Sequence, residues 1–106
     1  MNKYNAKKTI IDGIEFASIK ESKRYRDLKL MEKAGLITDL VTHPQYELLP
    51  KQKGERKAVY TADFRYTENG VEIVEDAKSE PTRKKPDYVL RRKLMLWVHG
   101  IEIREV

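Results

Sequence analysis

The clearest pattern in this 106-residue sequence is a pair of alternating polar and apolar runs, at 59–68 and 71–78, separated by Asn69-Gly70. An Asn-Gly pair between such runs favours a type I′ turn, because both turn residues need a positive φ. We therefore predict an antiparallel hairpin in which Glu68 pairs with Val71. Continued along both strands, this register places Asp63 directly opposite Asp76.

The two faces of this hairpin differ in polarity. Alternation places Lys78 on the face of Asp76, beside Thr61 and diagonal to Asp63, whereas the other face carries a predominantly apolar set of side chains: Tyr60, Ala62, Phe64, Tyr66, Val71, Ile73 and Ala77. Directly opposed carboxylates repel each other, and a divalent cation with oxygen ligands is the natural compensation. The pattern predicts one core face and one face bearing a functional site.

Val74 and Glu75 do not fit this division, because Val74 falls on the polar face and Glu75 on the apolar face. Helices on both faces of the sheet would bury Val74. Glu75 fits only if it reaches an edge or if a bulge shifts the register. Such a bulge would leave open whether Glu75, rather than Asp76, is the acid beside Asp63.

Turn and capping signals divide the N-terminal half. Asp12-Gly13 predicts a small hairpin over 9–16. The S-x-x-E pattern from Ser18 to Glu21 is a helix capping box, so we expect a helix from Ser18 to about Ala34, ended by Gly35. Its apolar residues predict a buried face with Glu21 at the N-terminal edge: Tyr25, Leu28, Met31 and Ala34. Residues 36–49 should be extended on both sides of Pro44, which must mark an edge, a bulge or a break.

The C-terminal part predicts a loop, a helix and a strand. Residues 79–86 form a cationic loop between two prolines, and Asp87 caps a helix from Tyr88 to about Val98, closed by Gly100. Its expected core face is apolar: Leu90, Leu94, Trp97 and Val98. The alternating run 101–106 predicts a final strand.

Composition limits the classes of protein that fit. The length predicts a single domain over 1–106, with 1–8 as a flexible basic arm. The net charge of +5 favours a polyanionic partner, and the absence of cysteine excludes disulfides and thiolate metal sites. No stretch approaches the roughly 18 apolar residues of a membrane span, so we expect a cytoplasmic protein, with no membrane partner and no small-molecule cofactor.

From Ser18 onward the predicted order is helix, three strands, helix, strand, with an acid on the first helix, Asp63 on the second strand and Asp76-Ala77-Lys78 on the third. This arrangement resembles the PD-(D/E)XK nuclease superfamily, and most closely its small phage-encoded endonucleases and Holliday-junction resolvase-like members. Ala62-Asp63 replaces the family's Pro-Asp, and Asp76 replaces its commoner glutamate. The resemblance implies an α/β fold with a restriction-endonuclease-like αβββαβ core, a mixed central sheet flanked by helices, and an added N-terminal β-hairpin.

The resemblance also implies roles for individual residues. Asp63, Asp76 and the main-chain carbonyl of Ala77 would bind Mg²⁺ or Mn²⁺, and Glu21 would reach the metal through water or hold a second ion. Lys78 would orient the attacking water or stabilise charge at the phosphate. The implied activity is metal-dependent endonucleolytic hydrolysis of branched or structured DNA, in recombination, replication or packaging, in the host cytoplasm if the protein is phage-encoded. One site per chain cuts one strand, so paired cleavage predicts a homodimer.

Each candidate also has a purely structural interpretation. Asp63 and Asp76 can be solvated strand carboxylates neutralised by Arg65 and Lys78, and the capping box explains Glu21 without a metal. His43 and His99 receive no catalytic role. The cations after the third strand are candidate DNA contacts: Arg83, Lys84, Lys85, Arg91 and Arg92. A non-catalytic basic nucleic-acid-binding protein, or the nuclease subunit of a restriction or transposition complex, are the alternative functions.

Overall fold

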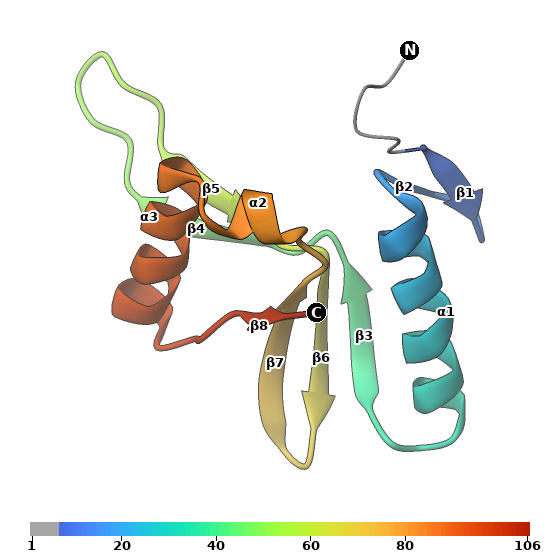
Figure 1. Cartoon of the computed structure of the whole chain (residues 1–106). Helices are drawn as coiled ribbons and strands as arrows, with labels where there is room; N and C mark the ends of the chain where they lie inside the picture. The colour runs from blue at the N-terminus through green and yellow to red at the C-terminus, as the bar shows by residue number, and fades with distance from the viewer. Residues whose placement is uncertain (1–6) are drawn as a thin grey trace.

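A four-stranded mixed sheet lies between helices on its two faces (Figure 1). The computed structural model describes residues 7–106, so most of the predicted arm over 1–8 lies outside the described residues. The elements are β1 (Thr9–Ile11), β2 (Ile14–Phe16), α1 (Ile19–Lys33), β3 (Thr38–Thr42), β4 (Gln45–Leu49), β5 (Ala58–Thr61), β6 (Phe64–Glu68), β7 (Val71–Asp76), α2 (Glu80–Arg83), α3 (Pro86–Leu94), the π-helix η1 (Met95–His99) and β8 (Arg104–Glu105).

The sheet has the strand order β3-β6-β7-β8. The pairs β3-β6 and β6-β7 are antiparallel, and the pair β7-β8 is parallel. Two further strand pairs, β1-β2 and β4-β5, stand outside this sheet. The predicted α/β class, with a mixed sheet flanked by helices and an N-terminal hairpin, is confirmed.

The hairpin register predicted from Asn69-Gly70 is confirmed throughout β6 and β7. Glu68 pairs with Val71 and Phe64 pairs with Glu75, with every intervening pair in step. Asn69 and Gly70 have φ values of 51° and 76°, as a type I′ turn requires. The register shows no bulge up to Glu75, which removes the irregularity that would have exchanged Glu75 for Asp76.

The prediction of one continuous strand from residue 59 to 68 is wrong. The chain leaves its first pairing after Thr61, which pairs with Gln45 of β4, and begins a second pairing at Phe64 with β7. Lys78 therefore has no ladder partner in Thr61, because β7 ends at Asp76. With the break at His43-Pro44, this gives five strands between α1 and α2 instead of three.

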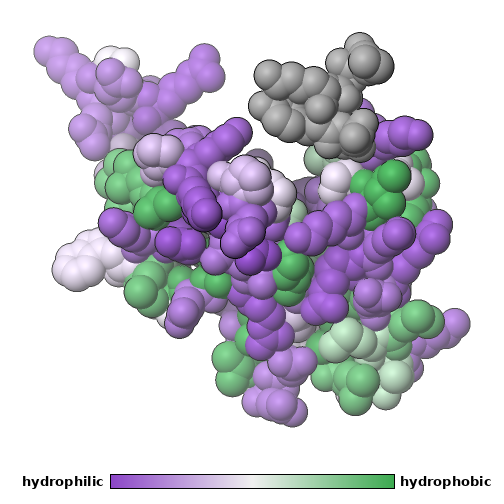
Figure 2. Space-filling model, viewed as in Figure 1, coloured by the Kyte–Doolittle hydropathy of each residue, from purple (hydrophilic) through white to green (hydrophobic). Residues whose placement is uncertain are grey.

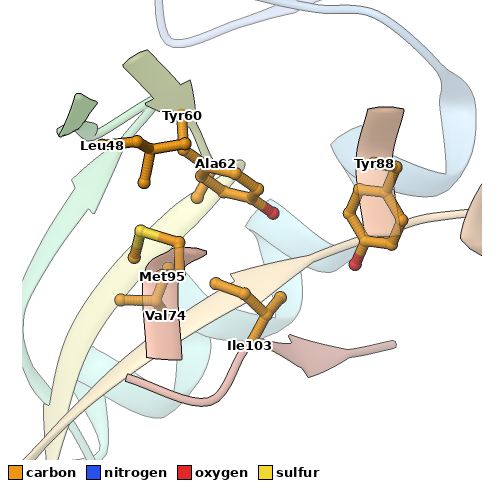
Figure 3. Close-up of a cluster of buried hydrophobic side chains, with 7 residues drawn as sticks. All are labelled: Leu48, Tyr60, Ala62, Val74, Tyr88, Met95 and Ile103. Atoms are coloured by element: carbon orange, nitrogen blue, oxygen red, sulfur yellow. The ribbon is translucent and has the colours of Figure 1, made fainter. Parts of the chain in front are cut away.

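The break also divides the predicted apolar face between two cores. Tyr60 and Ala62 pack with Val74 on the side of α3, together with Leu48, Tyr88, Met95 and Ile103 (Figure 3). Phe64 and Tyr66 pack on the side of α1, with Phe16, Tyr25, Leu28 and Ile37. Helices on both faces thus bury Val74, as its position in the pattern required.

Helix α1 follows its predicted signals. The Ser18 hydroxyl accepts a hydrogen bond from the Glu21 N–H at 3.1 Å, and Gly35, with φ of 79°, ends the helix after the C-cap Ala34. Tyr25, Leu28 and Glu21 are buried and Met31 is half-buried, but Ala34, which was predicted on the same face, is exposed. The capping interaction places Glu21 in the first turn, at the end of the helix nearest the close of β7.

The C-terminal helices begin differently from the prediction in two ways. Residues 80–83 form the short helix α2 inside the predicted loop, with Pro81 in its first turn. Lys85, and not Asp87, is the N-cap of α3, because Pro86 takes the first turn, where its missing N–H and fixed φ cost nothing. Gly100 does close the helical segment, with φ of 68°.

The predicted core face of this helix is right for Leu94 and wrong for its other three residues. Tyr88 and Met95, two helical turns apart, are the residues buried against the sheet, and Leu94 packs beside them. Leu90, Trp97 and Val98 lie at the surface, and Trp97 is 86% exposed. The final strand is confirmed, although only Arg104 and Glu105 pair with β7.

Glu75 is fully buried on the α1 side of the sheet and is held by an ion pair. Arg24 donates two hydrogen bonds to its carboxylate, at 2.7 and 2.8 Å, and the Tyr66 hydroxyl also donates to it. Arg104 in turn donates to the Tyr66 oxygen at 3.1 Å. This network joins α1 to β7 and β8, and it accounts for the acid that the alternating pattern left unexplained.

We predict that Arg24→Ala lowers the free energy of unfolding by about 3–5 kcal/mol, because it leaves the Glu75 carboxylate buried without a cation. Urea denaturation measures this change. Arg26→Ala, on the same helix but exposed, should change stability by less than about 0.5 kcal/mol. The double variant Arg24→Ala/Glu75→Gln should recover part of the loss, and equal stabilities of all variants would contradict the assignment.

Candidate active site

Asp63 and Asp76 lie side by side where β6 begins and β7 ends. The Asp63 N–H donates to Asp76 Oδ1 at 3.0 Å, and the Ala77 N–H donates to Asp63 Oδ2 at 2.7 Å. Each carboxylate is thus held by the main chain of the other strand. The structure therefore places the two acids together, as the hairpin register indicated.

Both carboxylates are buried, with 8% of Asp63 and 0% of Asp76 exposed. Burial raises the pKa of Asp63, against the lowering effect of the Ala77 N–H, and raises the pKa of Asp76 to about 6, against that of Lys78. Asp76 Oδ2 is a buried oxygen that finds no hydrogen-bond partner within residues 7–106. Desolvated carboxylates of this kind favour either a proton or a cation.

Glu21 approaches these acids from the first turn of α1. Its side chain is buried, and its negative charge raises the pKa of both Asp63 and Asp76. Its main-chain N–H takes part in the helix cap, while its carboxylate Oε1 lies 2.8 Å from His43 Nε2. The capping role and a role in the site are therefore compatible, since they use different atoms.

His43 is the site residue that the sequence interpretation missed. It lies at the break between β3 and β4, with φ of 53°, and its main-chain N–H donates to the Asp63 carbonyl at 2.9 Å. One residue thereby contacts both Glu21 and Asp63. The signal present in the sequence was the predicted break at Pro44, which ends a strand at His43, but only the fold brings that strand end to the two acids.

Lys78 follows β7 and lies on the side of Asp76. Its Nζ is 3.9 Å from Asp76 Oδ1, and 29% of its side chain is exposed. Its main-chain carbonyl accepts hydrogen bonds from Lys20 Nζ at 3.2 Å and Arg83 Nε at 3.1 Å. These bonds anchor the chain just beyond the two acids, so the ammonium is held next to the site while it stays accessible.

The five predicted DNA-contacting cations divide into three groups. Arg83 and Arg92 form ion pairs with Glu105 of β8, at 3.7 and 3.3 Å. Lys85 and Arg91 line a cavity together with Asp76 and Lys78. Lys84 is exposed and stands outside that cavity. In Figure 2, hydrophilic residues cover the middle of the face in view, where α2 lies in Figure 1.

Within residues 7–106, no three His, Asp or Glu side chains form a ready metal-binding group. The donor chemistry nevertheless fits a hard divalent cation. Asp63 and Asp76 are adjacent, desolvated oxygen donors, Glu21 is near both, and the oxygen without a partner belongs to Asp76.

The same described part of the chain has no helix of the length and apolarity needed to cross a bilayer.

The burial of Asp76 predicts a pH-dependent stability in metal-free solution. Its pKa of about 6 in the folded chain exceeds the ordinary value of 3.8. The folded chain therefore favours the neutral acid. The contribution of this acid to the free energy of unfolding is complete below about pH 4 and is lost as the pH rises through 6. Two pKa units correspond to about 3 kcal/mol.

We expect Asp76→Asn to gain stability relative to the wild type by up to about 3 kcal/mol between pH 4 and 7, because it cannot ionise. Urea denaturation in EDTA measures the difference. Asp27→Asn, an exposed change on α1, should keep the pH dependence of the wild type. A constant difference between Asp76→Asn and wild type would contradict the prediction.

Comparison with known proteins identifies a family and leaves the activity to be inferred from the site. No curated protein and no solved structure matched the chain. A family model described as "Protein of unknown function (DUF1064)" matches residues 1–101. Because the match spans nearly the whole sequence, the chain belongs to the DUF1064 family.

Proposed function

We propose that this protein is a metal-dependent DNA endonuclease with the restriction-endonuclease-like core of the PD-(D/E)XK superfamily. The observation that carries the proposal is the convergence of Glu21, Asp63, Asp76 and Lys78. These residues come from α1, the start of β6, the end of β7 and the segment after it. Three acids and one lysine, with a buried Asp76 oxygen that has no partner among residues 7–106, suit the hydrolysis of an anionic ester.

The topology supports this proposal. When β4-β5 and the four-residue α2 are taken as insertions and η1 as the end of α3, the order from α1 onward is α1, β3, β6, β7, α3, β8, with an antiparallel β3-β6-β7 unit and β8 parallel to β7. This is the αβββαβ order of the superfamily. The acids stand at the end of β7 that the fold brings to the N-terminus of α1. The arrangement supports the resemblance on grounds independent of the short sequence motif.

In this mechanism Asp63, Asp76 and the Ala77 carbonyl would hold Mg²⁺ or Mn²⁺, with Glu21 contacting the ion through water. When bound, the metal supplies charge screening at the phosphate and a bound water of lowered pKa. His43 holds the Glu21 carboxylate at 2.8 Å and fixes its orientation. Lys78, anchored through its carbonyl, places its ammonium where charge develops on the phosphate oxygens.

The proposed substrate is branched or otherwise irregular DNA, bound through its phosphates. Lys85, Lys84 and Arg91 are exposed cations near or beside the site, and such contacts give affinity without sequence readout. One site per chain cuts one strand, so we include a homodimer in the proposal, with roles in recombination, replication or packaging of phage DNA.

A non-catalytic DNA-binding protein is the second candidate. It is favoured by the contacts that the acids make with other side chains, His43 with Glu21 and Lys78 with Asp76, and by the lack of a ready metal-binding group among residues 7–106. The two candidates differ in a single measurement, since only the nuclease breaks phosphodiester bonds in a metal-dependent manner.

We predict that the wild-type protein nicks or cuts supercoiled plasmid or a synthetic four-way junction with Mg²⁺ or Mn²⁺ and is inactive in EDTA. Asp76→Asn should reduce the rate by at least about 100-fold, because it removes an anionic ligand from the site. Asp27→Asn should cleave like the wild type. Gel electrophoresis of the products measures both rates.

Identical products from wild type and Asp76→Asn in every metal condition would refute the nuclease and favour the binding protein. A faster reaction on the junction than on the matching linear duplex is the expected result for a resolvase-like enzyme. Equal rates on the two DNAs would retain the nuclease but reject the preference for branched DNA.

A further inference from the structure

A separate cavity of about 210 Å³ opens on the α3 side of Asp76. Tyr60 and Thr61 at the end of β5 line one part of it, and Lys85, the N-cap of α3, and Arg91, in the last turn of that helix, line another. Asp76 and Lys78 contribute to the same lining, whereas neither Glu21 nor Asp63 does. The cavity is therefore next to the proposed reaction centre without being the same place.

The Tyr60 hydroxyl is the strongest sign that this cavity binds something. The residue is 2% exposed, and within residues 7–106 its oxygen has no hydrogen-bond partner. In Figure 3 the hydroxyl points away from Leu48 and towards the side where Tyr88 lies. The Tyr88 hydroxyl donates to Glu105 at 3.1 Å, and no hydrogen bond joins it to Tyr60 among the described residues. Buried hydroxyls are nearly always satisfied, so this donor calls for an acceptor from outside the chain.

The charges around the cavity indicate an anionic acceptor. Lys78, Lys85 and Arg91 line it against the carboxylates of Asp76 and Asp87. The first turn of α3 also lies here, and its free N–H groups add partial positive charge. Arg91 and Lys85 are exposed, and no ion pair involves them among the described residues. Two cations and a buried phenol donor suit a phosphate group better than a base.

We propose that this cavity binds a phosphate group of the DNA substrate, the neighbour of the phosphate that is cleaved. The proposal rests on the nuclease function, because it assumes a DNA strand across Asp76. Tyr60 Oη, Lys85 and Arg91 are its ligands. Lys78 stands between the two phosphates, since it contacts Asp76 and also lines the cavity. The site thus sets which phosphodiester of the strand lies over the acids.

The phosphate can come from two sources. A terminal 5′-phosphate carries close to two negative charges at neutral pH, whereas an internal phosphodiester carries one. A cavity that holds a terminal phosphate would position cleavage beside a strand end. A cavity that holds an internal phosphate would position cleavage anywhere along a strand. Both use the same ligands, so the substrate end must be varied to tell them apart.

The test is equilibrium binding in EDTA, where cleavage does not occur, to a fluorescent single-stranded oligonucleotide bearing either a 5′-phosphate or a 5′-hydroxyl. The variants are Tyr60→Phe and Arg91→Ala. Lys33→Ala and Lys93→Ala are matched controls, since both side chains are exposed cations outside this cavity. Tyr60→Phe removes only a hydroxyl without a partner, so thermal unfolding should show no loss of stability.

We expect Tyr60→Phe and Arg91→Ala to bind roughly 5- to 10-fold more weakly than wild type, and more weakly than either control. Loss confined to the 5′-phosphorylated oligonucleotide identifies a terminal phosphate. Equal loss on both oligonucleotides identifies an internal one. The proposal is overturned if both variants bind both oligonucleotides no more weakly than the control variants do. Because no cleavage is measured, this failure is distinct from failure of the nuclease, which the plasmid assay decides.

Discussion

Strand β7 buries two consecutive carboxylates, and much of the structure depends on how it does so. Successive side chains point to opposite faces, so Glu75 and Asp76 enter different environments. Glu75 meets Arg24 and becomes half of a buried ion pair that holds α1 to the sheet. Among the described residues, Asp76 accepts a hydrogen bond from the Asp63 N–H, and its Oδ1 lies 3.9 Å from the Lys78 ammonium. The first carboxylate is satisfied, whereas Oδ2 of the second has no hydrogen-bond partner in that part of the chain.

The ion pair between Arg24 and Glu75 also affects the position of Glu21 relative to Asp76. Arg24, which pairs with Glu75, lies one turn beyond Glu21 on α1, and Asp76 directly follows Glu75 on β7. The buried ion pair therefore limits how far Glu21 can move relative to Asp76. The network on the α1 side of the sheet thereby ties the helix that carries Glu21 to the strand that carries Asp76.

The interruption at Ala62-Asp63 has a comparable effect. A continuous strand would have tied Asp63 into a regular ladder on one sheet. Because the chain instead changes pairing partners there, the Asp63 carboxylate bonds to the Ala77 N–H and its carbonyl to His43. The same change moves Tyr60 into the core beside α3, at the cavity proposed to hold a phosphate. One break in one strand thus supplies residues to both candidate sites.

Much of the local structure follows from the sequence, because short-range signals control it. The turn residues Asn69 and Gly70, with positive φ, set the register of the hairpin and so bring Asp63 close to Asp76. The N-cap at Ser18 starts α1 and so puts Glu21 in its first turn. The burial of Val74 could also be predicted. This apolar residue falls on the otherwise polar face of the hairpin, so that face of the sheet had to be covered as well.

Other features were decided only by tertiary contacts. Glu75 needed a partner from α1, the buried face of α3 depended on what it packs against, and His43 joined the site because strands distant in sequence end together. Pattern and propensity describe a residue's neighbours along the chain. The partner of a buried charge, and the residues that a strand end contacts, depend on neighbours in space. The sequence specifies those neighbours only through the completed fold.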